Sequence, residues 1–66
     1  MSYEKGEVIT VNDEDSLMAA MGAVEAGPVS YSDVHTYIAH IDDPDALFQW
    51  LEKAVIKNIE CKVMVL

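Results

Sequence analysis

The sequence contains no arginine, and its four lysines face twelve aspartates and glutamates, which gives a formal charge of −8. Proteins bind nucleic acid largely through lysine and arginine, which displace the counterions of the phosphates. A chain so poor in cations repels DNA, RNA and anionic membranes. The lack of basic residues therefore excludes direct nucleic-acid binding and predicts that a partner selected by charge is basic.

Cysteine is almost absent as well. The single Cys61 cannot form an internal disulfide, and one thiol cannot supply the ligands of a zinc site. No apolar run reaches the roughly 18 residues of a membrane-spanning helix, and no apolar segment of a secretory signal follows Met1. These absences predict a cytoplasmic protein without membrane association, and we expect Cys61 to be buried and unreactive.

Motifs for catalysis and for cofactor binding are also missing. Gly6, Gly22 and Gly27 are isolated, so the chain has no glycine-rich phosphate loop. His35 and His40 are not spaced to meet on one side of a helix, and no serine lies in a G-x-S-x-G sequence. We therefore expect a protein that is not an enzyme and holds no cofactor.

A length of 66 residues allows one domain with a small core, residues 1–66. The chain is 52% hydrophobic, which favours a folded protein over a disordered one. Residues 1–6 are polar and lack a periodic apolar pattern, so we expect them to be flexible.

Four segments have clear patterns of regular structure. β-branched residues predict strands, and apolar residues at helical spacing between capping residues predict helices. The predicted elements are a strand over 7–11, a helix between Asn12 and Gly27, a helix from Pro44 to about Asn58, and a strand over 59–66.

The segment 29–41 has two interpretations. Its composition is typical of strands, but Ser30 and Asp33 fit a helix capping box. Apolar side chains also recur there at helical spacing, at Val34, Tyr37, Ile38 and Ile41. We predict a helix, hence an α+β fold of order β-α-α-α-β whose paired terminal strands pack against helices. A hairpin would instead give the order βαββαβ of a ferredoxin-like fold.

Six acids gather where two of the helices are expected to begin. They are Asp13, Glu14 and Asp15 in one group and Asp42, Asp43 and Asp45 in the other. Neither group has the glycine and glutamate that a calcium-binding loop needs, so we expect no metal site. Asp43 before Pro44 is typical of a helix N-cap. Capping explains the positions of these acids but not the scarcity of balancing cations.

We therefore interpret these six carboxylates as partner-binding residues that replace phosphates in contacts with lysine and arginine. In size, charge and class, the chain is similar to the small acidic inhibitors that phages make against host nucleases and CRISPR complexes. The resemblance implies a nucleic-acid mimic that occupies the DNA- or RNA-binding surface of a basic protein or ribonucleoprotein complex.

The alternative is a small adaptor or regulatory subunit that docks through an apolar helix face. Met18 and Met21 lie on one predicted helix, and Phe48 lies beside the apolar stripe of another. The negative charge would then serve solubility. The apolar final strand could also pair with its copy through a free edge, so both a monomer and a homodimer remain open.

Overall fold

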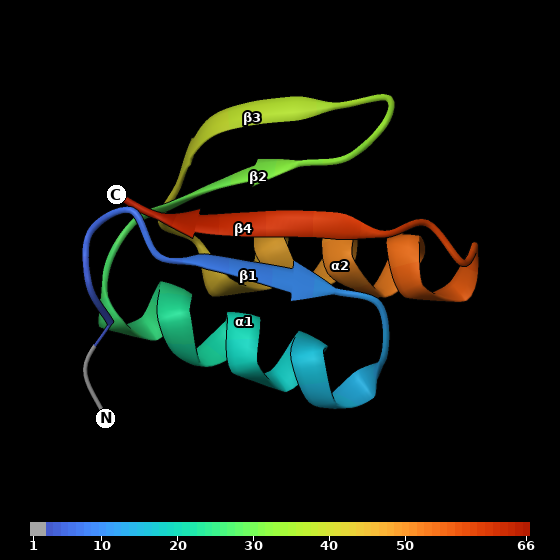
Figure 1. Cartoon of the computed structure of the whole chain (residues 1–66), viewed down its shortest axis with the longest axis horizontal. Helices are drawn as coiled ribbons and strands as arrows, with labels where there is room; N and C mark the ends of the chain where they lie inside the picture. The colour runs from blue at the N-terminus through green and yellow to red at the C-terminus, as the bar shows by residue number, and fades with distance from the viewer. Residues whose placement is uncertain (1–2) are drawn as a thin grey trace.

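The computed structural model describes residues 3–66, which form two helices and one antiparallel sheet of four strands (Figure 1). The elements in chain order are β1 (Val8–Val11), α1 (Glu14–Ala26), β2 (Val29–Ser32), β3 (Tyr37–Ile41), α2 (Pro44–Ile56) and β4 (Cys61–Val65). The α+β class and the pairing of the two terminal strands, β1 with β4, are confirmed.

The prediction of a helix over 29–41 is wrong, because this segment forms the hairpin of β2 and β3. Val29 pairs with Ile41 and Tyr31 pairs with Ile38, so a two-residue step on β2 is matched by a three-residue step on β3. The extra residue is a β-bulge. It places Ile38 and Ile41 on the same face although they are three residues apart, and this spacing imitates a helix.

Asp33 stabilises the hairpin turn instead of starting a helix. Its carboxylate accepts hydrogen bonds from the backbone N–H groups of His35 and Thr36, each at 2.7 Å. Its own N–H donates to the carbonyl of Thr36 at 2.8 Å. Aspartate commonly closes turns in this way, so the acid that fitted a capping box is explained by the turn.

The sheet has the strand order β1-β4-β2-β3, so β4 and β2 are internal and β1 and β3 are the edges. A ferredoxin-like sheet has its first and third strands inside, so the resemblance to that fold stops at the element order. Each helix links two parallel strands across one intervening strand, as in a split βαβ unit. The free edge expected at the final strand does not exist, because β4 is paired on both sides.

The core lies between the helices and one face of the sheet. Along β4, Cys61, Val63 and Val65 are buried, whereas Lys62 and Met64 are exposed. Such alternation means that only one face of a sheet is covered. The burial of Cys61 is confirmed.

The start of the described chain is held by two polar contacts. The Tyr3 hydroxyl donates to the carbonyl of Ala19 on α1 at 3.3 Å, and the Gly6 N–H donates to the carbonyl of Val65 at 2.7 Å. Gly6 has φ 89°, a conformation that favours glycine. Tyr3 and Gly6, in the segment expected to be flexible, therefore contact α1 and β4, and residues 1–2 lie outside the described residues.

Candidate functional site

The two acidic groups lie at opposite ends of the molecule. β1 and β3 run in opposite directions in the sheet, so the helices that follow them begin at opposite ends (Figure 1). Asp13, Glu14 and Asp15 surround the start of α1, and Asp42, Asp43 and Asp45 surround the start of α2. The structure therefore does not bring the six predicted partner-binding residues together.

Two of the six carboxylates cap helices. Asp13, rather than the predicted Asn12, is the N-cap of α1, and it accepts hydrogen bonds from the backbone N–H of Ser16 at 2.9 Å and from its hydroxyl at 2.7 Å. The backbone bond, followed by the hydroxyl bond, lowers the pKa of Asp13. Asp43 caps α2 before Pro44, as predicted, by accepting from the N–H of Asp45 at 3.0 Å. Replacing either cap with a residue that has no side-chain acceptor would destabilise its helix.

A groove of about 490 Å³ lies between the two helices. Because α1 and α2 are antiparallel, the first turns of α1 face the second half of α2. The groove is lined by Glu14, Leu17 and Met18 of α1 and by Phe48, Glu52, Val55 and Ile56 of α2. Apolar side chains from two separate elements thus meet in one concave surface.

The apolar lining of the groove is unusually exposed. Met18 and Ile56 keep 66% and 76% of their surface in solvent, and Phe48 is also exposed. Helices of globular proteins normally turn their apolar residues towards the core, and clustered exposed apolar residues are typical of binding surfaces. The groove therefore has the character of a contact surface rather than of a packed core.

Carboxylates flank this apolar lining on both helices. Glu14 of α1 and Glu52 of α2 line the groove itself, and Asp13 and Asp15 are the chain neighbours of Glu14. Cations near such a rim are attracted to it. The groove thus matches the chemistry of an apolar segment that carries lysine or arginine.

The sequence identified part of this groove. Met18 and Phe48, two of the three residues assigned to a docking face, lie in it, whereas Met21 is partly buried against the core. Ile56 was missed, although Phe48, Glu52 and Ile56 recur every four residues and so follow one side of α2. What the sequence could not show is that this stripe lies beside Glu14 and Met18.

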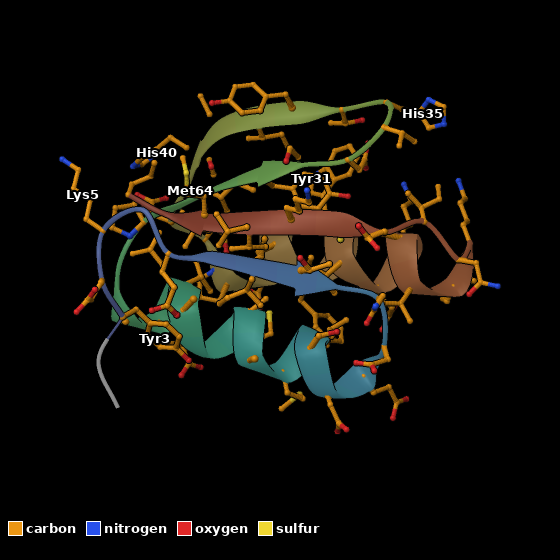
Figure 2. The ribbon with its side chains drawn as sticks, in the orientation of Figure 1. Tyr3, Lys5, Tyr31, His35, His40 and Met64 are labelled. Carbon is orange, nitrogen blue, oxygen red and sulfur yellow. The ribbon has the colours of Figure 1, made fainter. Side chains whose placement is uncertain are left out.

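The two histidines of the chain do not lie together in the fold. His35 lies in the hairpin turn and His40 on β3, and Figure 2 shows them at opposite ends of the hairpin. Within residues 3–66, no three histidine, cysteine, aspartate or glutamate side chains are placed to hold a metal ion. Burial raises the pKa of the Cys61 thiol, which disfavours the nucleophilic thiolate.

Comparison with protein-family models, with curated proteins and with solved structures finds no match to this chain. Within residues 3–66, neither helix has the length and apolar character needed to cross a membrane.

Proposed function

We propose that this chain is a non-enzymatic binding protein whose groove between α1 and α2 holds an apolar, basic segment of a partner protein. The observation that supports the proposal is the exposed apolar lining formed by Met18, Phe48 and Ile56 between the carboxylates of Glu14 and Glu52. An amphipathic helix with lysine or arginine beside its apolar face has the matching chemistry.

The apolar contacts would supply most of the affinity. Complete burial of a methionine, phenylalanine or isoleucine side chain contributes about 1.5–3 kcal/mol, part of which offsets the loss of motional freedom on association. The carboxylates would mainly accelerate association and select basic segments over acidic ones. Binding is therefore expected to weaken, but not to vanish, when salt is added.

The proposal is tested with a helical peptide of leucine and lysine whose leucines all lie on one face. We expect its titration into the isotope-labelled protein to shift the NMR signals of Met18, Phe48 and Ile56 most strongly. A matched leucine and glutamate peptide should bind much more weakly. Shifts spread evenly over the whole surface, or equal affinity for the two peptides, would contradict a specific groove.

Matched variants separate the groove from the general charge of the molecule. Glu14→Gln with Glu52→Gln and Asp42→Asn with Asp45→Asn remove the same number of charges, at the groove and at the distant start of α2. We expect the first pair to weaken peptide binding several-fold and the second pair to change it little. Ile56→Ser should weaken it at least tenfold, whereas Val34→Ser, at an equally exposed site outside the groove, should not.

The nucleic-acid mimic remains a second candidate, which the charge of −8 supports. It requires a basic partner that contacts many carboxylates at once, but the two acidic groups begin antiparallel helices at opposite ends. A partner of this kind would be as sensitive to Asp42→Asn with Asp45→Asn as to the groove pair. Equal loss from both pairs would therefore favour the mimic over the groove.

A further inference from the structure

A second, smaller cavity lies where the last turns of α2 meet the turn of the hairpin, at one end of the molecule (Figure 1). Its volume is about 160 Å³. Trp50, Lys53 and Lys57 line it from α2 and its C-cap, and Tyr31 and Asp33 line it from the hairpin. We call it the lysine cavity. Its helical residues recur at intervals of three and four, so they form one side of the helix, and the residues of α2 that line the groove form the other side.

The lysine cavity is locally basic although the molecule is acidic. Two of the four lysines line it, and Asp33 is the only acid among its lining residues, whereas acids outnumber lysines three to one in the sequence. The oxygens of Asp33 already accept hydrogen bonds from the Tyr31 hydroxyl at 2.6 Å and from the backbone N–H groups of His35 and Thr36 at 2.7 Å each. A ligand in the cavity therefore meets two ammonium groups and one carboxylate that already holds three donors.

Capping of α2 does not require the two lysines. Lysine side chains near the end of a helix can hold its last carbonyl groups, but here the backbone does so. The N–H groups of residues 57–59 donate to the carbonyls of residues 53–55 at 2.8–3.1 Å, and Asn58 takes the left-handed conformation that closes a helix, with φ 58°. Lys53 and Lys57 are also four residues apart, so like charges are neighbours, which is unfavourable for a helix. An anion held between them would remove this repulsion.

An aromatic wall stands beside these ammonium groups. The ring of Trp50, the only tryptophan of the chain, is 37% exposed, and the Lys53 Nζ lies 5.7 Å from the centroid of this ring. The ring of Tyr31 lies 5.9 Å from that of Trp50, centroid to centroid, at 41°. Because Tyr31 is fully buried, the core fixes the position of the wall. The cavity thus offers a ligand a flat apolar surface and a cationic one side by side.

We propose that the lysine cavity binds a small aromatic carboxylic acid, whose carboxylate accepts hydrogen bonds from Lys53 and Lys57 and whose ring lies against Trp50. With His35 neutral, the two lysines and Asp33 carry one net positive charge, which one carboxylate balances. The cavity is smaller than the about 300–1,000 Å³ of a typical ligand pocket, so it limits the ligand to one ring with one acidic group. This site does not depend on the function proposed for the groove.

Titration of the full chain with benzoate tests the proposal, because the single tryptophan reports directly on the cavity. The ionic strength is held constant, since salt screens the attraction. We expect a saturable change in Trp50 fluorescence and in the NMR signal of its indole N–H. Cyclohexanecarboxylate, which has the charge without the flat ring, should bind several-fold more weakly, and benzylamine, which has the ring with the opposite charge, should not saturate. Equal responses to benzoate and benzylamine, or equal affinity for benzoate and inorganic phosphate, would overturn the proposal.

Matched variants locate the site. Lys53→Gln with Lys57→Gln removes two charges from exposed positions of the cavity, and Lys5→Gln with Lys62→Gln removes two from exposed positions outside it. We expect the first pair to lower the association constant for benzoate at least fivefold and the second pair to change it less than twofold. Equal losses from the two pairs, or no loss from the first, would overturn the assignment.

The groove provides an independent control. Ile56→Ser lies in the groove and should leave benzoate binding unchanged, whereas Lys53→Gln with Lys57→Gln should not weaken the leucine and lysine peptide. Failure of one site is therefore distinguishable from failure of the other. Loss of benzoate binding in Ile56→Ser would show that benzoate occupies the groove, which would overturn the proposal for the lysine cavity.

Discussion

At the scale of single residues, the contact between Tyr31 and Asp33 links the core to the hairpin turn. The Tyr31 side chain is fully buried, and its hydroxyl donates to the Asp33 carboxylate at 2.6 Å. Burial, followed by the hydrogen bond to Asp33, raises the pKa of Tyr31. The same hydrogen bond is the main cause of the lowered pKa of Asp33.

We expect Tyr31→Phe to lower the free energy of unfolding by about 1–2 kcal/mol at neutral pH, because it removes a hydrogen bond to a charged acceptor. The pKa of Asp33 is lower in the folded chain than its ordinary value of 3.8. Its contribution to stability is therefore present above pH 3.8 and is lost as pH falls through the lower folded pKa. The free energy of unfolding of the parent protein and of Tyr31→Phe should be measured by urea unfolding as the pH is lowered from neutral to below 3.8. The difference between the two free energies should become smaller as the pH falls.

Two observations check this account of Tyr31. NMR titration should find the pKa of Asp33 higher in Tyr31→Phe than in the parent protein. Tyr37→Phe removes a hydroxyl from an exposed site and should leave stability almost unchanged. An unaltered Asp33 titration in Tyr31→Phe would mean that the hydroxyl bond does not determine the acidity of this carboxylate.

At the scale of elements, local signals predicted both helices and both terminal strands, but they gave the hairpin over 29–41 only as the alternative to a helix. The ends of the helices could be predicted because capping is a local effect. Asp43 and Pro44 start α2, Gly27 ends α1, and each acts only on the adjacent helical turn. The hairpin was hidden because the bulge on β3 depends on pairing with β2, which a single segment does not reveal. The sequence identified only part of the groove for a similar reason. Each helix carries its own row of apolar residues, but only the fold brings Met18 of α1 beside Phe48 of α2.

The start of α1 allows capping to be separated from partner binding. We expect Asp13→Ala to lower the melting temperature of the protein, because Ser16 loses its capping partner. Asp13→Asn keeps a capping oxygen while it removes the charge, so it should cost much less. Thermal unfolding measures both variants, with Asp42→Asn, which is not an N-cap, as the control for loss of charge alone. Equal destabilisation by the alanine and asparagine variants would mean that charge, not the cap geometry, matters at this position.

At the scale of the whole molecule, the charge of −8 opposes the compact state. We expect thermal stability to rise by several degrees between about 0.01 M and about 1 M sodium chloride, as the Debye length falls from about 30 Å to about 3 Å. Asp42→Asn with Asp45→Asn should show a smaller rise because less repulsion is left to screen. A melting temperature that is independent of salt would mean that the acids are too far apart to repel one another appreciably.

The internal position of β4 also determines the order in which the sheet can assemble. β1 and the hairpin of β2 and β3 do not pair with each other, and only β4 joins them. The pairing of Val8 with Met64 closes nearly the whole length of the chain, and such distant contacts form slowly. During refolding, the hairpin and the helices can form early from local contacts, but the sheet becomes continuous only when β4 inserts. The amide protons of β4 should accordingly exchange with solvent only when the whole molecule unfolds.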